Sequence, residues 1–321
     1  MDLNVFKQKV NEYTKKGIPF LFLIDFEKQK PFVCKLSNLE KENIFYSINS
    51  NGNLKSIIEG ETIPLQINPI KKSVYKEAFN IVKSNIILGN SYLTNLTFPT
   101  SISTSTSLMH IIKRANANYK LFFKNEFISF SPESFIKIKN NKIYTFPMKG
   151  TIDALINNAK DLLLSDKKET YEHNTIVDLM RNDLAMISTN VKINRFRYID
   201  KIKTQKGSIL QVSSEIEGEL KKNWTTNFAD LLLKILPAGS ISGAPKEKTV
   251  EIIQQAEKKK RGYYTGVFGV FDGRNIDSAV LIRYIERNNN KLIYRSGGGI
   301  TSKSDVDFEY NELLQKIYIP V

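Results

Sequence analysis

The chain has 321 residues, 41% of them hydrophobic and 11% aromatic, which is typical of a globular protein with a sizeable core and excludes a disordered chain. No apolar run approaches the roughly 20 residues of a membrane span, and the charged N-terminal segment is unlike a secretory signal, so we expect a cytoplasmic protein with no membrane partner. The net charge of +14 would suit nucleic acid, but the lysines are scattered and no RNA-binding or zinc-finger pattern occurs, so a basic nucleic-acid-binding protein is kept only as the non-enzymatic alternative.

The N-terminal part of the chain contains short segments of strand-forming composition. These segments are residues 18–27, 30–37 and 43–49, with a turn at SNGN after the last of them. Apolar side chains then recur at helical spacing over 74–87, and 91–102 returns to strand composition. The pattern predicts a sheet-forming start, then a helix and a longer strand.

A strand pair is predicted on either side of the turn KNNK. Folding the chain there sets Ile138 opposite Ile143 and Glu133 opposite Met148, so that Lys149 is one position off Glu133. The two side chains would point apart in a perfect ladder, but a nearby proline interrupts each strand and permits a bulge. The hairpin therefore leaves open whether Glu133 and Lys149 face each other.

The second half of the chain alternates long helical patterns with strands. A helical pattern covers 159–187, and another covers 245–260, where Pro245 suits a first helical turn. Strand composition follows over 262–273 and 277–286. Because strands come in runs rather than in strict alternation with helices, we predict a single intertwined α+β domain of mostly antiparallel sheets packed with flanking helices.

The chain ends in a predicted helix whose Ser304 and Asp307 have capping-box spacing. On this helix Glu309, Glu312 and Lys316 follow one another at spacings that put them on one face. Spacing alone equally fits an ion pair on a solvated helix surface. The pattern thus predicts the helix, and leaves the role of its charged face open.

Three consecutive glycines, 297–299, stand directly before that helix. They would let a ligand approach the backbone and offer bare amide hydrogens to an anion, or they form a tight turn. Acidic residues on another predicted helix, Glu172 and Asp178, could complete the oxygen shell of Mg²⁺, which usually takes one or two protein carboxylates. Together with Glu312 and Lys316, these residues are what a Mg²⁺-bound carboxylate substrate requires.

The segments SPESF, PMKGT, EHNTIVDLMRNDLA, LPAGSISGAPK, RGYYTGVFG, IRY, SGGGI and EYNELLQK resemble, in order and spacing, the chorismate-utilising enzyme family. That family includes anthranilate, aminodeoxychorismate, isochorismate and salicylate synthases. The resemblance implies a chorismate-binding catalytic region over 76–321, with 1–75 as a short strand-rich part of the same domain. This N-terminal part is shorter than usual, which implies that the inhibitor-binding region of some anthranilate synthases is missing.

The resemblance also implies roles for particular residues. Glu172 and Glu312 would hold Mg²⁺ against the ring carboxylate of chorismate, and Glu133 would be the general acid that helps the 4-hydroxyl leave. Substrate-binding roles fall on the following residues: Thr151, Ser240, Tyr264, Arg283, Gly297, Gly299 and Lys316. Of these, Ser240 would contact the ring carboxylate, and Arg283, Tyr264, Lys316 and the glycine amides would hold the pyruvyl carboxylate.

Lys149 distinguishes the branches of this family. Its position resembles the nucleophilic lysine of aminodeoxychorismate synthases, where anthranilate synthases usually carry alanine. A lysine amine could add to ring carbon C2 while the 4-hydroxyl departs, and ammonia could then enter at C4 and expel the lysine. Because the amine must be neutral to attack, we expect the site to lower the pKa of Lys149.

Two residues depart from the family pattern. Gln211 stands where most members have a histidine, which puts any acid-base role of that histidine in doubt. Leu93 stands where amino-transferring members usually have glutamine and water-adding members have lysine, and leucine cannot deprotonate water.

The resemblance thus implies component I of an aminodeoxychorismate synthase, which makes 4-amino-4-deoxychorismate for 4-aminobenzoate and folate, with anthranilate synthase component I as the alternative. Cys34 is the only cysteine and lacks the glycine-flanked setting of a glutaminase nucleophile. Ammonia is therefore expected from a separate glutamine amidotransferase subunit.

Overall fold

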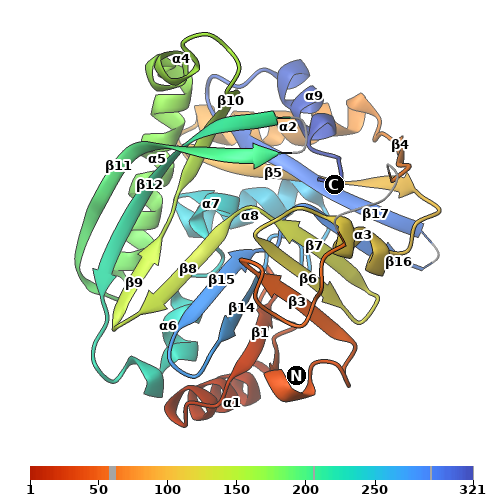
Figure 1. Cartoon of the computed structure of the whole chain (residues 1–321). Helices are drawn as coiled ribbons and strands as arrows, with labels where there is room; N and C mark the ends of the chain where they lie inside the picture. The colour runs from red at the N-terminus through yellow and green to blue at the C-terminus, as the bar shows by residue number, and fades with distance from the viewer. Residues whose placement is uncertain (58–62, 205–206, 290, 321) are drawn as a thin grey trace.

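The computed structural model describes residues 1–57, 63–204, 207–289 and 291–320. Two antiparallel sheets with helices around and between them make up this part of the chain (Figure 1). Among the helices of the described residues, none combines the length and the apolar composition that crossing a bilayer requires.

The first sheet has nine strands within the described residues, in the order β10-β12-β9-β8-β15-β14-β1-β2, with β11 paired to β12 at the edge. Its strands are β1 (Phe20–Ile24), β2 (Phe32–Lys35), β8 (Ser134–Lys139), β9 (Lys142–Thr145), β10 (Met148–Asp153), β11 (Thr189–Thr204), β12 (Gly207–Glu219), β14 (Val267–Phe271) and β15 (Ile276–Val280). The second sheet has eight described strands, in the order β13-β5-β17-β16-β7-β6-β3, with β4 beside β5. Its strands are β3 (Ile44–Ile48), β4 (Gln66–Asn68), β5 (Leu93–Ser103), β6 (Tyr119–Phe123), β7 (Phe127–Ser131), β13 (Gly243–Ala244), β16 (Tyr284–Asn288) and β17 (Lys291–Ile300).

Helices pack against both sheets. They are α1 (Leu3–Lys15), α2 (Lys72–Ile87), α3 (Leu108–Arg114), α4 (Ala159–Ser165), α5 (Lys167–Ala185), α6 (Phe228–Lys234), α7 (Gly239–Ser242), α8 (Lys246–Glu257) and α9 (Val306–Gln315), with 3-10 turns at Leu36–Asn38 and Trp224–Thr226. In Figure 1, α2 and α9 lie beside β5 and β17, α5 lies behind β11 and β12, and the short α7 lies near the centre.

Strand β1 illustrates how the sheets share a core. All five of its residues are buried, because β1 lies between β14 and β2 and both of its faces are covered. Phe20 and Phe22 pack toward the helical side, where Phe22 meets Phe228 of α6 at 5.8 Å between ring centroids. Leu21 and Leu23 point the other way, into a cluster with side chains of the second sheet. Alternate residues of β1 therefore fill the cores on its two faces, so the whole strand is apolar.

Several predicted elements are confirmed and some are wrong at their ends. The α+β class with antiparallel sheets is confirmed, and Ile138 lies opposite Ile143 as predicted. The helix predicted over 159–187 is broken at Asp166, which ends α4 and whose side chain caps α5. The terminal helix is capped by Asp305 rather than Ser304, since the Asp305 carboxylate accepts from the first-turn amides.

Three further differences concern the candidate site. The glycines 297–299 form neither a turn nor an open loop, but continue β17 in register with β5. The strand predicted over 277–286 is two strands, one in each sheet, and Arg283 lies at the crossing between them with φ of 49°. Glu133 does not pair with Met148, because β10 leaves the hairpin and pairs with β12.

An N-terminal helix, α1, was not predicted. Its sequence nevertheless has the spacing of a helix with one buried face, since Phe6, Val10 and Thr14 are four residues apart and are all buried. Asp2 supplies the N-cap by accepting from the Asn4 amide.

Candidate active site

A cavity of about 240 Å³ opens where the two sheets and α5, α7 and α9 come together. Its volume suits a small metabolite rather than a macromolecule. Nine of the eleven residues assigned to the site from the sequence line it: Glu133, Lys149, Glu172, Ser240, Tyr264, Arg283, Gly297, Gly299 and Lys316. They come from segments far apart in the chain, which the fold brings together.

Glu133 lies in the break between β7 and β8. The backbone there is held by a bond from the Val280 amide to the Glu133 carbonyl and by one from the Glu133 amide to Ser131 Oγ. Its carboxylate accepts from Ser240 Oγ at 2.5 Å. Burial raises the pKa of Glu133, and the Ser240 hydroxyl and nearby cations lower it only in part, so the pKa stays above its ordinary value. A carboxyl group in this setting holds its proton to higher pH, as a general acid requires.

Lys149 lies in an irregularity of the ladder between β10 and β12. The register shifts between Met148 and Thr151, and Gly150 there has a φ of 80°. Lys149 Nζ contacts Glu172 Oε2 of α5 at 2.7 Å. Burial lowers the pKa of Lys149, but the carboxylates around it, Glu172 above all, raise the pKa further, so the net direction is upward. The expected lowering of this pKa is wrong for the protein without substrate or metal.

Lys316 stands at the C-terminal end of α9. Its Nζ contacts Glu312 Oε1 at 2.7 Å and donates to the carbonyl of Gly297 at 2.9 Å. Burial lowers the pKa of Lys316, and Glu312 offsets this only in part because Lys149 and Arg283 add to the lowering. The second lysine is thus fixed by a backbone carbonyl as well as by a carboxylate.

Arg283 and Tyr264 form another side of the cavity. Arg283 lies over the Tyr318 ring at 5.2 Å, and its buried Nε has no hydrogen-bond partner among the described residues. Tyr264 is 3% exposed, and burial raises its pKa to about 12, so its hydroxyl remains a proton donor at neutral pH. A buried cation with an unused N–H beside a phenol can receive a carboxylate.

Two of the predicted site residues do not line the cavity. Thr151 is exposed on β10 and pairs with Gln211. Glu312 contacts Lys316 and is not part of the lining, although its carboxylate is close enough to Lys149 to raise that pKa. Asp178, considered as a further metal ligand, pairs with Arg181 and lines a separate hollow of about 1130 Å³.

Sequence reasoning missed several lining residues, among them Asn95, Thr265 and Ile282. Asn95 lies on β5 opposite Gly299, and the other two flank predicted residues in the chain. The two departures from the family pattern, Leu93 and Gln211, also line the cavity. Leu93 packs close to Gly299, so this side of the wall is apolar.

The donor set is compatible with Mg²⁺. Among the described residues no three His, Cys, Asp or Glu side chains are grouped as a complete metal cage. Mg²⁺ does not need one, because it usually binds one or two carboxylates and takes its other oxygens from water or substrate. Glu172 and Glu312 each form an ion pair with a lysine that lines the cavity. Glu312 also lies close to Gly298 of the lining: a Cβ built at Gly298 would be 3.7 Å from Glu312 Oε1 and 3.4 Å from Glu309 Oε2. Glu172 and Glu312 are therefore suitable ligands.

The comparison with known proteins agrees with this geometry. The chain belongs to the chorismate binding enzyme family, whose model matches residues 19–320. It is 50% identical to an uncharacterized PabA-like protein of Pasteurella multocida over all of both chains. It is 29% identical to aminodeoxychorismate synthase component 1 of Bacillus subtilis, covering 78% of this chain and 55% of that one. Anthranilate synthase component I of Streptococcus pneumoniae superposes with a TM-score of 0.67 and 26% identity, covering 81% of this chain and 60% of that one. Family membership gives no support to the nucleic-acid alternative.

Proposed function

We propose that this protein is the synthase component that converts chorismate and ammonia to 4-amino-4-deoxychorismate, the step that feeds 4-aminobenzoate and folate. The observation that carries the proposal is Lys149, a lysine in a strand irregularity that lines the cavity beside Glu172. Lys149 also lowers the pKa of Glu133 through its charge, so the proposed nucleophile and the proposed acid are neighbours. The similarity to an aminodeoxychorismate synthase component is in keeping with the assignment, and the similarity to anthranilate synthase components does not distinguish the two activities.

Binding of chorismate would use both carboxylates of the substrate. Arg283, Tyr264 and Lys316 are proposed to hold the pyruvyl carboxylate, because they combine two cations with a phenol that keeps its proton. Glu172 and Glu312 would hold Mg²⁺, which when bound supplies positive charge against the ring carboxylate.

The chemistry then divides between Lys149 and Glu133. The neutral Lys149 amine attacks C2, and Glu133 gives its proton to the departing 4-hydroxyl, which leaves as water. Ammonia adds at C4 as the ring double bonds shift back, the bond from C2 to Lys149 breaks, and Lys149 leaves as the neutral amine. The proton that the added ammonia loses returns to Glu133. The Lys149 ammonium group must first lose a proton to solvent, so that the amine is neutral when it attacks. Burial is already the largest single cause acting on the pKa of Lys149, and it lowers that pKa. Once Glu172 is engaged elsewhere, the main opposing cause is gone and the pKa of Lys149 falls.

Anthranilate synthase is the second candidate, since a solved anthranilate synthase component superposes on this chain. The two activities differ in product. Chromatography after incubation with chorismate, Mg²⁺ and an ammonium salt at raised pH should give 4-amino-4-deoxychorismate. Anthranilate as the main product would replace the proposal with its alternative, and isochorismate would place the chain in the water-adding branch, against which the apolar Leu93 argues.

Ammonia is proposed to come from a separate glutamine amidotransferase subunit. Cys34, the only cysteine, lies on β2, which contributes nothing to the lining of the cavity. Burial raises the pKa of the Cys34 thiol, which is the wrong direction for a nucleophile. Glutamine should therefore support no turnover by the purified chain, whereas ammonium should. Glutamine-dependent turnover by this chain alone would refute the two-subunit arrangement.

A further inference from the structure

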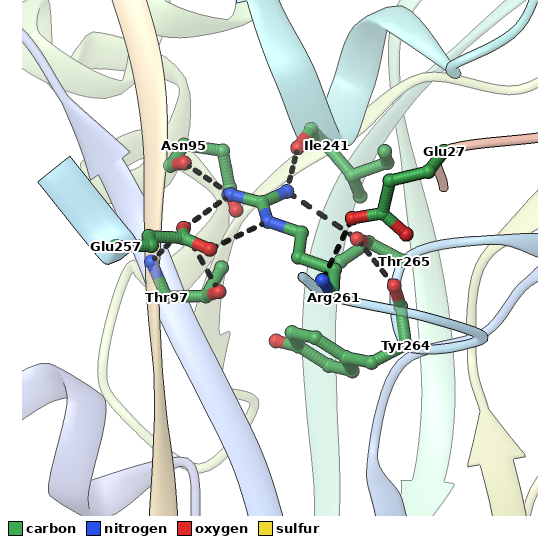
Figure 2. Close-up of polar contacts among 8 residues, drawn as sticks. All are labelled: Glu27, Asn95, Thr97, Ile241, Glu257, Arg261, Tyr264 and Thr265. Atoms are coloured by element: carbon green, nitrogen blue, oxygen red, sulfur yellow. Dashed lines mark hydrogen bonds and ion pairs between the residues drawn. The ribbon is translucent and has the colours of Figure 1, made fainter. Parts of the chain in front are cut away.

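A buried ion pair lies directly behind the cavity wall. Glu257 is the last residue of α8 and Arg261 lies four residues further along the chain; their side chains are 6% and 1% exposed. Arg261 Nη2 contacts Glu257 Oε1 at 2.6 Å and Nε contacts Oε2 at 3.0 Å, which is a bidentate arrangement (Figure 2). Such a pair is costly to bury unless its remaining hydrogen-bonding groups are satisfied.

The remaining donors of Arg261 reach three other segments. The guanidinium group donates to the carbonyl of Ile241 in α7 at 2.9 Å, to the carbonyl of Asn95 in β5 at 2.7 Å, and to Thr265 Oγ1 at 3.3 Å (Figure 2). With the two bonds to Glu257, every N–H of the guanidinium group is used. Arg261 has no donor left for a ligand, and it does not line the cavity.

Its partner Glu257 extends the same connection. Glu257 Oε1 accepts from both the amide and the hydroxyl of Thr97 on β5, at 2.9 and 3.0 Å. On the other side, Glu27 accepts from the backbone amides of Arg261 and Gly262, at 2.8 and 3.0 Å. Four segments, α7, α8, β5 and residues 261–265, are thereby joined through one ion pair.

The segments joined in this way carry proposed site residues. Ser240, which donates to Glu133, immediately precedes Ile241, whose carbonyl Arg261 holds. Tyr264 immediately precedes Thr265, whose hydroxyl donates to the Tyr264 carbonyl and accepts from Arg261. Helix α7 has only four residues, too few to be stable without such support.

We propose that Arg261, oriented by Glu257, is a positioning residue: it holds α7 and residues 261–265 so that Ser240 meets Glu133 and Tyr264 faces the cavity. A lysine could not replace it, because an ammonium group lacks the planar fork that reaches Glu257 and two carbonyls at once. The kinetic part of this inference rests on the proposed function, and the structural part stands without it.

A double-mutant cycle tests the kinetic part. Arg261→Lys should lower kcat/KM about a hundredfold and Ser240→Ala about tenfold, values of the size that misplaced catalytic groups produce. The double variant should fall little below Arg261→Lys alone, because Ser240 no longer contributes once α7 is released. Losses that simply multiply would overturn the proposal, since Arg261 would then act independently of Ser240.

Val10→Ala is the control for general destabilisation. Val10 is fully buried on α1 and is not part of the cavity lining. Its truncation should lower Tm but leave kcat/KM unchanged, and its effect should be independent of Ser240→Ala. If Arg261→Lys does not fold, Glu257→Gln takes its place in the cycle and should show the same coupling to Ser240→Ala at smaller size.

Hydrogen exchange tests the structural part without any assumption about substrate. In the free protein, Arg261→Lys or Glu257→Gln should speed amide exchange in peptides covering 239–243 and 262–266, and Val10→Ala should not. Unchanged exchange in both peptides would overturn the positioning role. If the wild type consumes no chorismate, the proposed function fails, while this exchange result still decides the role of Arg261.

Discussion

Two lysines line the same cavity, each paired with a glutamate, and they differ in how each lysine is held. Lys149 and Glu172 come from separate elements, β10 and α5, and meet at 2.7 Å. Lys316 and Glu312 belong to one helix end and also meet at 2.7 Å, but Lys316 donates in addition to a backbone carbonyl. The pKa of Lys149 is raised by its carboxylates despite burial, whereas burial leaves the pKa of Lys316 lowered.

This difference between the two lysines suggests that they have different functions. The charge of Lys149 depends on Glu172, a proposed metal ligand, so it can change when Glu172 is engaged by something else. Lys316 is fixed by Gly297 and by its position at the C-terminal end of α9, which favours a cation. We therefore expect Lys149 to act in the chemical step and Lys316 to act in binding.

The largest effect is expected at Lys149. Lys149→Ala should lower kcat for amination by at least roughly a thousandfold, as removal of a nucleophile does. The Kd for chorismate should change much less, because Arg283, Lys316 and the proposed Mg²⁺ ligands remain. Steady-state kinetics and calorimetric titration measure the two quantities separately. An undiminished rate of amination would return Lys149 to the role of a structural ion-pair partner.

Lys316→Ala should show the opposite pattern. Losing a charged hydrogen-bond donor costs about 1.5–3 kcal/mol, so Kd and KM should rise roughly ten- to hundredfold with a smaller change in kcat. Lys303→Ala, at an exposed lysine near Tyr171, is the matched control and should have no effect. If Lys316→Ala lowers kcat and leaves Kd and KM unchanged, the proposed difference in function between Lys149 and Lys316 is wrong.

The hairpin at Ile138 and Ile143 was predictable because its turn residues, Asn140 and Asn141, tolerate the positive φ values of 54° and 61° that a tight turn needs. The pairing of β10 with β12 was not predictable, since it joins residues about sixty positions apart in the chain and no local pattern encodes it. The crossing of the chain at Arg283, where one predicted strand is divided between the two sheets, could not be predicted for the same reason.

The candidate site was accessible mainly through ordered motifs. Residues that would touch substrate stand in those motifs, so most were found together in one cavity. The group that supports them was not found: Arg261 acts through the carbonyls of Ile241 and Asn95, and carbonyls carry no residue-type signal. Thr151 shows the converse error, because its neighbour Lys149 faces the cavity while Thr151 itself is exposed.

A moderate effect is expected at the carboxylates. Glu312→Gln should raise the Mg²⁺ concentration needed for half-maximal activity at least roughly tenfold, in line with the cost of altered metal ligation. Tm should change little, because Glu312 is partly exposed. Asp178→Asn, on the same helix as Glu172 but facing away from the cavity, should leave the Mg²⁺ requirement unchanged. If Glu312→Gln leaves the Mg²⁺ requirement unaltered, Glu312 and Lys316 form only a solvated ion pair on the helix surface.

The smallest effect is a shift in pH dependence. Glu133 must carry its proton to act as an acid, and the Ser240 hydroxyl lowers its pKa by donating to the carboxylate. Ser240→Ala should therefore raise the pKa of Glu133 further and move the basic limb of the kcat/KM profile to higher pH. Ser242→Ala, which removes a hydroxyl that donates to the Ala238 carbonyl, is the matched control and should leave that limb in place. If the basic limb of the kcat/KM profile of Ser240→Ala moves to lower pH, Glu133 is not the general acid.

The most direct test of the account is mass spectrometry of the wild-type protein quenched during incubation with chorismate and Mg²⁺ in the absence of ammonia. Peptide mapping should place the mass of chorismate less one water on the peptide that contains Lys149, and addition of ammonium should remove it as the amination product forms. Chorismate-derived mass on Lys316 or another lysine, or amination without any protein-bound mass, would contradict the covalent role of Lys149.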